Sequence, residues 1–487
     1  MDAKNTVKQA IDQRRQALCD LHHTIWQSAE MGYEEIQSAK ALCAYMAAEG
    51  FTVETGVADI PTAFVASYGS GKPVIAILAE YDALSQLSQQ GGCPTKDPIP
   101  GQESGHGCGH SALGTGSAAA AVAVKEYLQK SGKPGTVRLY GCPAEENGWG
   151  KTFMARAGLF DDVDAAFTWH PFDVNGAWGT SSLANVSVKF KFTGRTAHAA
   201  AAPHDGRSAL DSCEIMNVGV NYLREHIIPE ARLHYAYLDV GGSSPNVVQD
   251  HACVHYFVRA PKNAQVAEIL ERVKDVARGA ALICGTQVNI EIQAGMSDYI
   301  PNPTMTRVID TALREMGAPE FTAEDQALAA QYFQSQPAEM RQKIEAGLAK
   351  RFGADKVAEV VAAPLDTTIL PLNITGIPMA GSTDVGDVSY VTPTAQVMLA
   401  GFCLGTTPHT WQVTGQTGSS IGEKGLLKAG EVMALAAAKV IDDPSLAEQA
   451  RQELVAETGG VYNCPVPAEV LPPVPAGVAQ RAKEAGL

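Results

Sequence analysis

The chain has 487 residues, 45% of them hydrophobic and 18% charged, and its 37 Lys and Arg against 53 Asp and Glu give a net charge of −16. This length exceeds one ordinary hydrophobic core, so we expect two or more domains. The acidic charge argues against a nucleic-acid-binding surface and against binding to an anionic membrane. No segment reaches the roughly 20 uninterrupted apolar residues of a spanning helix, and the N-terminus lacks a signal-peptide pattern, so we expect a cytoplasmic protein.

Residues 1–182 alternate between helical and strand patterns. Residues 5–49 predict two helices separated by Gly32 and Tyr33, and the apolar run 74–79 predicts a buried strand that ends in the acidic segment 80–82. Further along we expect a helix over 112–128, a strand over 136–140, a short helix over 152–157 and a strand over 165–169. This alternation predicts an α/β fold in which a mixed sheet is covered by helices on both faces.

The pattern changes after residue 182. Residues 185–192 alternate apolar with polar side chains, as a half-exposed strand does. We expect a helix over 207–226, strands over 233–240 and 251–258, a helix over 264–283 and a strand over 286–293. This β-α-β-β-α-β order predicts a smaller α+β domain, residues 183–299, inserted into the larger one.

The α/β pattern resumes in residues 300–487. Residues 323–358 are charged and helical, which predicts a helical insertion at about 320–360, and a Pro-rich tail begins at residue 459. We therefore expect a large domain made of residues 1–182 and 300–487.

Metal-binding residue types lie at the ends of the predicted strands. Cys108 and His110 are two residues apart in a loop flanked by Gly105, Gly107 and Gly109. Glycine lets the backbone bend so that both side chains can face one ion. The alternative interpretation is a structural loop, because short His and Cys motifs also arise by chance.

Glu145 and Glu146 directly follow a predicted strand, where neighbouring side chains point to opposite sides. One carboxylate can therefore bind a metal while the other faces a substrate, although a solvated loop would also carry such a pair. His170 ends an apolar strand, and His409 lies in a Gly/Thr/Pro loop before a helix. For each histidine the alternative is a ring bonded to the backbone.

Together these positions form a candidate metal centre. Cys108, His110, Glu146, His170 and His409 provide five ligands, enough for two divalent ions that share a bridging water. A Cys ligand suits Zn²⁺, whereas carboxylates also accept Mn²⁺. With a second carboxylate available as a base, the set predicts a metal-dependent hydrolase.

Several further segments carry a resemblance to a known family. They are Glu-Tyr-Asp-Ala-Leu at 80–84, the Cys/His loop, the Glu pair, Trp-His-Pro at 169–171, Ala-His-Ala-Ala at 197–200, Pro-Asn-Val-Val at 245–248 and Pro-His-Thr at 408–410. In this order they resemble the aminoacylase/carboxypeptidase-type dinuclear metal amidohydrolases, in the branch of hippurate and auxin-conjugate hydrolases that use a Cys ligand. The resemblance covers nearly the whole chain.

The resemblance implies a role for each residue. The five ligands named above would hold two ions, Glu145 would be the general base, and Asp82 would orient a ligand. His198 would stabilise the oxyanion by reaching from the insert into the site of a partner protomer. Asn246 and Arg259 would hold the carboxylate of the amino acid. The insert would serve as a dimerisation and lid domain of the large catalytic domain.

The same resemblance implies hydrolysis of an N-acyl amino acid, with p-aminobenzoyl-glutamate as the favoured small-molecule substrate. It also implies a homodimer through the insert, or a heteromer with a homologous protein. Residues 382–385 depart from the acidic pattern usual in the family, which we expect to alter the substrate pocket and to leave metal binding largely unaffected. The alternatives are a broader N-acyl-amino-acid or dipeptide hydrolase and a non-catalytic binding component of a heteromeric hydrolase.

Overall fold

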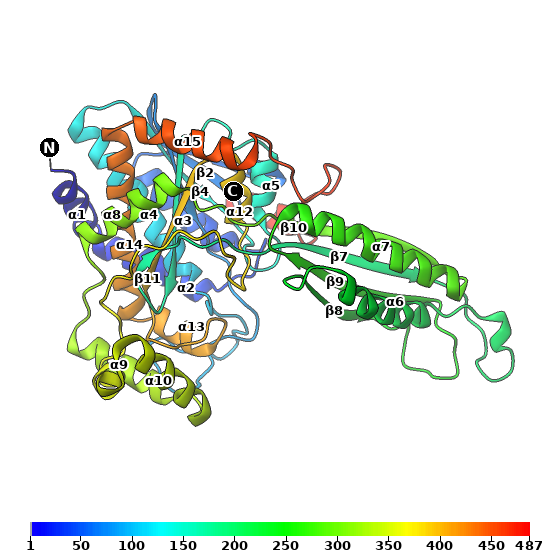
Figure 1. Cartoon of the computed structure of the whole chain (residues 1–487). Helices are drawn as coiled ribbons and strands as arrows, with labels where there is room; N and C mark the ends of the chain where they lie inside the picture. The colour runs from blue at the N-terminus through cyan, green and yellow to red at the C-terminus, as the bar shows by residue number, and fades with distance from the viewer. Residues whose placement is uncertain (1) are drawn as a thin grey trace.

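The computed structural model describes residues 2–487; Met1, where the first predicted segment starts, lies outside the described residues. Figure 1 shows a rounded main part, residues 2–182 and 300–487, from which an elongated insert, residues 183–299, projects to one side. Among residues 2–487, none of the helices is long and apolar enough to cross a membrane.

A seven-stranded mixed sheet forms the centre of the main part, as the α/β prediction required. Its strands run in the order β1 (Thr52–Thr55), β2 (Phe64–Ser70), β4 (Gly135–Gly141), β3 (Val74–Ala79), β5 (Ala165–Phe172), β11 (Thr394–Ala400) and β6 (Gly176–Ala177). The central strands β4, β3, β5 and β11 are parallel to one another. Every residue of β3 is buried, because helices cover both faces of the sheet.

The larger core packs helices against one face of this sheet. The helices are α1 (Ala3–Asp12), α2 (Arg15–Ser28), α3 (Ile36–Ala48), α4 (His110–Ser131), α8 (Pro303–Met316), α14 (Ser420–Asp442) and α15 (Ser445–Thr458). Helix α4 is rich in small residues, and a Cβ at Gly116 would lie 2.8 Å from Trp169 Nε1. The small residues therefore let α4 lie directly on β5, with its N-terminus at the end of that strand.

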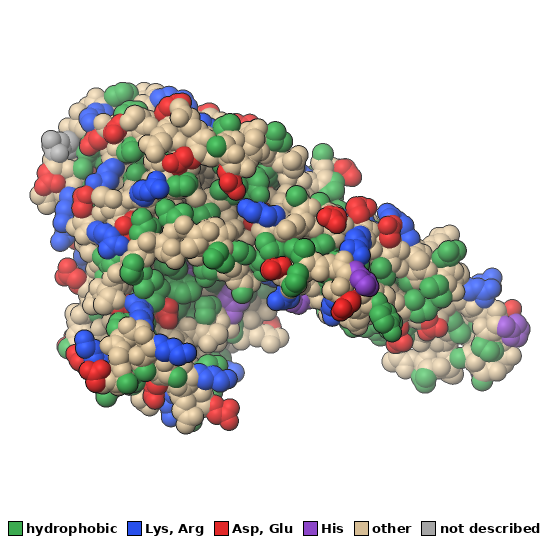
Figure 2. Space-filling view, viewed as in Figure 1, with side chains coloured by type: hydrophobic (Ala, Val, Ile, Leu, Met, Phe, Trp, Pro, Cys, Tyr) green, Lys and Arg blue, Asp and Glu red, His purple; other side chains and the backbone are tan. Residues whose placement is uncertain are grey.

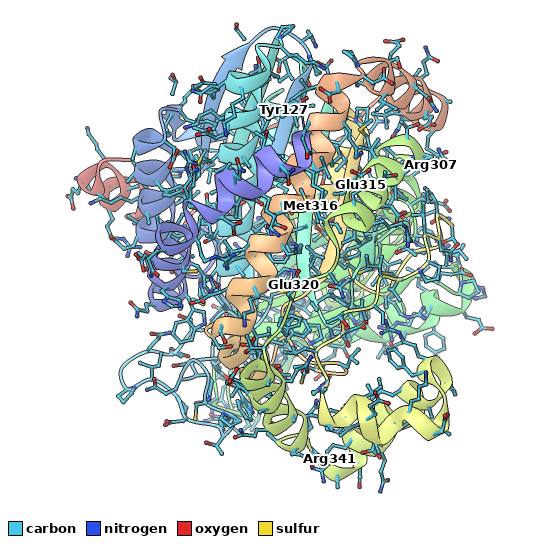
Figure 3. The ribbon with its side chains drawn as sticks, turned by 90° about the vertical axis from the view of Figure 1, so that its left-hand side faces the viewer. Tyr127, Arg307, Glu315, Met316, Glu320 and Arg341 are labelled. Atoms are coloured by element: carbon cyan, nitrogen blue, oxygen red, sulfur yellow. The ribbon has the colours of Figure 1, made fainter. Side chains whose placement is uncertain are left out.

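Shorter elements cover the opposite face and the lower edge. Helices α5 (Gly150–Arg156) and α12 (Val385–Val391) pack on the opposite face. Below the sheet lie α9 (Ala323–Gln334), α10 (Ala338–Phe352), α11 (Val357–Ala362) and α13 (Trp411–Thr417). We call α9, α10 and α11 the helical lobe. Figure 3, which labels Arg341 on α10 and Glu315 near the end of α8, shows this lobe at one end of the main part.

The insert has its own sheet and core. Four antiparallel strands run in the order β10 (Gln287–Met296), β7 (Ala184–Thr193), β9 (His251–Ala260) and β8 (Arg232–Asp239). Helices α6 (Ala209–Leu223) and α7 (Asn263–Cys284) cover one face of this sheet. Figure 2 shows the surface hollowed between the helical lobe and the insert.

The structure differs from the predicted elements in three places. Residues 3–48 form three helices instead of two, because the chain turns at Gln13 and Arg14 before α2 begins. Strands β1 and β2 lie in a stretch for which no strand was predicted. The Pro-rich tail ends in a helix, α16 (Val478–Ala485), whose Val478 and Ala482 pack against Ile36.

Candidate metal centre

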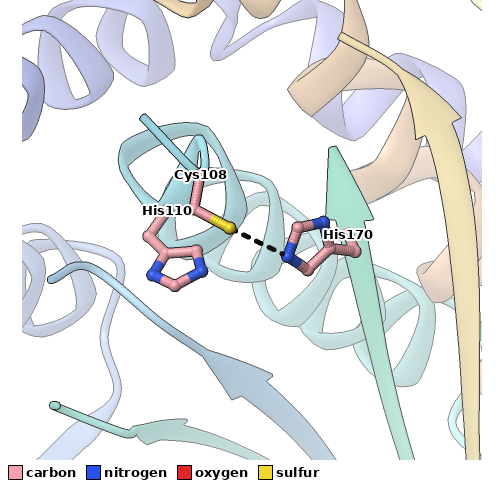
Figure 4. Close-up of side chains that lie close together, drawn as sticks. All are labelled: Cys108, His110 and His170. Atoms are coloured by element: carbon pink, nitrogen blue, oxygen red, sulfur yellow. Dashed lines mark hydrogen bonds between the residues drawn. The ribbon is translucent and has the colours of Figure 1, made fainter. Parts of the chain in front are cut away.

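The first group of potential ligands lies at the carboxyl end of the central strands. Cys108 and His110 stand where the long loop enters α4, and His170 lies on β5. One donor atom from each residue lies within 4.8 Å of the other two. Cys108 Sγ is 3.5 Å from His170 Nε2, the contact drawn in Figure 4.

A second group shares Cys108 with the first. Donor atoms of Cys108, Glu146 and His409 also lie within 4.8 Å of one another, and His409 Nε2 is 3.4 Å from Glu146 Oε2. His409 has a left-handed φ of 61°, and its backbone N–H donates to Gly107 O at 2.8 Å. This hydrogen bond ties the His409 loop to the Cys108 loop, although about 300 residues separate them.

The two groups fit divalent ions in chemistry and in spacing. Ligands about 2.1–2.3 Å from a tetrahedral ion lie roughly 3.4–3.8 Å apart, and the two distances above fall in this range. His110 Nε2 and Glu146 Oε1 are buried and have no hydrogen-bond partner among residues 2–487. Buried polar atoms are normally satisfied, so these two atoms are suited to bind a cation. The residues therefore fit divalent ions, and both groups that would hold them include Cys108.

Asp82 holds both groups in register. Its Oδ1 is 2.8 Å from His110 Nδ1, which turns Nε2 of the same ring toward the centre. Its Oδ2 accepts a hydrogen bond from the backbone N–H of Glu146 at 2.8 Å. One carboxylate thus contacts a residue of each group.

Glu145 lies beside the ligands without belonging to either group of three. Its carboxylate, Glu80 and His110 place one donor atom each within 4.8 Å of one another. Burial raises the pKa of Glu145 well above its usual range, and the nearby Glu80 and Glu146 carboxylates raise it further. A raised pKa gives a carboxylate the greater basicity that proton abstraction needs.

Three residues of this region were not predicted as site residues. Lys151 is fully buried, and its Nζ lies 2.7 Å from Glu80 Oε1 and 2.5 Å from Asp384 Oδ1. Glu80 Oε2 in turn lies 3.3 Å from His110 Nε2. The acidic end of β3 was visible in the sequence, but nothing there indicated that Lys151 and Asp384 would meet it. Segment 382–385, which departs from the pattern usual in the family, therefore reaches the metal centre through the contact of Asp384 with Lys151.

The three predicted residues of the insert do not lie together. Arg259 stands at the base of the insert, paired with Asn185 across the strands, and its Nη1 donates to Ser382 Oγ at 3.1 Å. His198 and Asn246 lie in two loops that meet beyond the far end of β9, where Ala199 N donates to Asn246 O at 3.0 Å. Strand β9 separates His251 from Arg259 by roughly 27 Å, so one chain does not bring Asn246 and Arg259 to the same carboxylate.

Comparison with known proteins decides the family. The model of peptidase family M20/M25/M40 matches residues 76–361, more than half of the chain. The chain belongs to this family. A p-aminobenzoyl-glutamate hydrolase subunit of Escherichia coli (strain K12) is 45% identical over 473 residues, covering 96% of this chain and 98% of that protein. The Xaa-Arg dipeptidase of Mus musculus is 28% identical over 92% of this chain and 91% of its own length.

Solved structures share the fold of this M20/M25/M40 chain. A putative aminohydrolase from methicillin-resistant Staphylococcus aureus has a TM-score of 0.62 at 18% identity, covering 90% of this chain and all of its own. A dinuclear metal binding peptidase of the M20 family from Bacillus subtilis has a TM-score of 0.54 at 17% identity, covering 88% and 99%. Family membership and the donor groups identify the chain as a metal-dependent hydrolase.

Proposed function

We propose that the chain hydrolyses the amide bond of an N-acyl or N-aroyl amino acid, with p-aminobenzoyl-glutamate as its substrate. The observation that carries the chemistry is Glu145, a half-buried carboxylate placed beside two groups of metal-binding donors. The substrate is suggested by the name of the 45% identical relative, which this chain covers almost completely.

The centre would hold two divalent ions, Zn²⁺ or Mn²⁺. Cys108, His110 and His170 would hold one, and Cys108, Glu146 and His409 the other. When bound, such ions lower the pKa of a water molecule and polarise the amide carbonyl. Glu145 would take one proton of the attacking water at its carboxylate as the water oxygen bonds to the amide carbon. It would then pass this proton to the amide nitrogen as the C–N bond breaks, which releases the free amino acid and the acyl group as its acid.

The insert would complete the substrate site. Arg259 at its base can bind the carboxylate of the amino acid through two parallel N–H groups. His198 and Asn246 lie too far along the insert to serve their own centre, so we propose that they serve the centre of a second protomer. There His198 would donate a hydrogen bond to the developing oxyanion.

The insert also offers a surface for that second protomer. Strand β8 is an edge of its sheet, and apolar residues on β8 and on the neighbouring α6 are exposed: Val218, Tyr222, Tyr235, Tyr237 and Leu238. An exposed edge strand with apolar side chains pairs readily with another strand. We propose that residues 183–299 act as a dimerisation and lid domain and that two β8 edges pair.

A homologous protein is the alternative partner for this surface. Another p-aminobenzoyl-glutamate hydrolase subunit of E. coli is 28% identical over 256 residues, which cover 50% of this chain and 57% of that protein. Two different subunits of that hydrolase are therefore both related to this chain. In a heteromer, the insert of this chain would pair with the corresponding part of a homologous protein.

The test is release of p-aminobenzoate from p-aminobenzoyl-glutamate by the purified, Zn²⁺- or Mn²⁺-loaded chain. Glu145→Gln is the matched control, because it keeps the size of the side chain and removes the base. Release by the wild type alone would support the proposal. Comparison of kcat/KM for N-acyl derivatives of glutamate, aspartate and aromatic amino acids, and for dipeptides, separates it from a broader hydrolase.

The same assay tests the alternative that the chain is a non-catalytic binding component. A wild-type chain that binds two ions and cleaves none of these substrates, alone or with a homologous partner, would contradict the proposed function.

A further inference from the structure

The turn between α2 and α3 contacts three of the loops that build the metal centre. We call residues 25–35 the α2–α3 clamp. Its backbone carbonyls accept hydrogen bonds from two of them: Ile25 O from His106 Nε2 at 3.1 Å, and Glu30 O from Ala83 N at 2.8 Å. The clamp thus holds the loop after Asp82 and the loop before Cys108.

The third loop, residues 144–149, carries Glu145 and Glu146. Glu35 Oε1 accepts a hydrogen bond from Ala144 N at 2.7 Å, at the start of this loop. Tyr33 Oη donates to Gly148 O at 2.7 Å, near its end. The clamp and this loop are in close contact, since a Cβ added to Gly32 would lie 2.0 Å from Asn147 Oδ1. The clamp therefore grips the loop at both ends.

This loop has a backbone that needs support. Ala144 and Trp149, at its two ends, both adopt left-handed φ angles, 60° and 56°. Such a conformation is uncommon for residues with a Cβ and costs free energy, so it persists only where surrounding contacts enforce it. The direction in which the Glu145 and Glu146 side chains leave β4 depends on the angle at Ala144, the residue whose N–H Glu35 holds.

Glu35 is an unusual residue to find at this place. Its side chain is fully buried, and its partners are one backbone amide and the Thr62 hydroxyl at 3.1 Å, neither of them a cation. Burial raises the pKa of its carboxyl group, and the Asp82 charge raises it further. A buried carboxyl group is costly to keep, so helix stability alone is a poor reason for its presence.

Capping of α3 is performed by another residue. Glu35 stands at the N-cap position, but its side chain makes no capping hydrogen bond. Glu30 instead accepts from Gln37 N and Ser38 N, both at 2.9 Å. Two carboxyl groups of one segment thus have different partners. Glu30 caps α3, and Glu35 accepts a hydrogen bond from the loop that carries the proposed general base.

We infer that Glu35 is a positioning residue for the hydrolytic reaction: by holding Ala144 N it sets the direction of Glu145 and Glu146. The inference rests on the proposed function for the role of Glu145. We expect Glu35 to affect the rate of the chemical step and to have little effect on substrate binding, because Glu35 is buried beneath the loop and bonds to its backbone.

The test is Glu35→Leu, which keeps roughly the volume and removes both acceptor oxygens. Displacement of a catalytic group by about 1 Å costs on the order of 100-fold, so we expect kcat to fall about 10- to 100-fold with KM changed less than about threefold. Hydrogen–deuterium exchange of peptides covering 142–150 should become about tenfold faster. Glu30→Leu, the matched control, should leave both quantities close to those of the wild type.

Unchanged kcat and unchanged exchange in a folded Glu35→Leu protein would overturn the inference. If that variant does not fold, Thr62→Val removes the second partner of the carboxyl group and should shift both readouts in the same direction by a smaller factor; no shift would also overturn it. The exchange measurement needs no substrate. It therefore decides the role of Glu35 even if wild-type protein hydrolyses nothing, a result that would count against the proposed function alone.

Discussion

Replacement of Lys151 by Met should destabilise the main part of the chain strongly. Lys151 is completely buried and is in contact with two carboxylates, at 2.7 Å from Glu80 and 2.5 Å from Asp384. Methionine has a similar length and keeps the packing of the stem, but it removes the charge. The substitution therefore leaves two carboxylates facing each other in the interior without the cation between them.

The magnitude follows from the burial of all three groups. Removing one partner of a buried ion pair costs about 3–5 kcal/mol, because the remaining charge is uncompensated. Here one cation serves two carboxylates, so we expect a loss near the upper end, about 5 kcal/mol at pH 7. Without Lys151 the pKa values of Glu80 and Asp384 rise in the folded state. The deficit should therefore shrink as the pH falls through these raised pKa values, where both groups take up protons, and grow as the pH rises through them.

Urea denaturation followed by tryptophan fluorescence measures this loss. All five Trp residues, at positions 26, 149, 169, 178 and 411, lie outside residues 183–299. Trp149 packs against Phe257 of the insert, and the other four report on the main part of the chain. Lys125→Met is a matched control. Lys125 is 8% exposed and lies 3.0 Å from Glu49, but Glu49 keeps a second cation, Arg14, at 2.7 Å.

The control should cost about 1 kcal/mol, because its carboxylate stays paired. A Lys151→Met variant that unfolds at the same urea concentration as the wild type, or as Lys125→Met, would refute this account of the buried charges.

Three further predictions concern the metal centre, the pH dependence and the assembly. Cys108→Ala should abolish binding of both ions, because both groups share this thiol, whereas His409→Ala should leave one ion per chain; elemental analysis after dialysis distinguishes them. Burial lowers the pKa of His22 to about 4 in the folded chain, so as the pH falls this ring is protonated first in the unfolded chain. The free energy of unfolding should therefore fall by roughly 3 kcal/mol as the pH drops from 6.5 to 4. Urea denaturation of the metal-free protein should show a flatter pH dependence for His22→Gln, and an unchanged one would contradict the assignment. Tyr222→Glu, on exposed α6, should shift the mass measured by light scattering toward the 51.3 kDa of one chain, whereas Leu282→Glu on α7 should not.

The local patterns of the sequence predicted many of the elements, but not β1, β2 or the break between α1 and α2, and they suggested a set of donors. The apolar run of β3 predicted a strand buried on both faces, and the alternation from Asn185 to Phe192 predicted one that is open on one side. These signals are local, because side-chain periodicity depends only on neighbouring residues. The same is true of Cys108, His110 and Glu146, whose residue types and strand-end positions already indicated metal binding.

Contacts between distant segments could not be read in this way. Lys151 and Asp384 are 233 residues apart, and nothing in either segment indicates that both meet Glu80. Glu35 looks like one more exposed acidic residue until the fold places it under Ala144, 109 residues later. The separation of Asn246 from Arg259 likewise depends on the length and direction of β9 within the folded insert.

The sequence by itself determined which chemistry this chain can perform, because metal affinity and basicity belong to side-chain types. The tertiary structure decided which carboxyl groups lie beside the Cys and His donors and which ones are buried behind them. These placements depend on burial and on distances of a few ångströms, which arise only when the loops at the end of the sheet pack together.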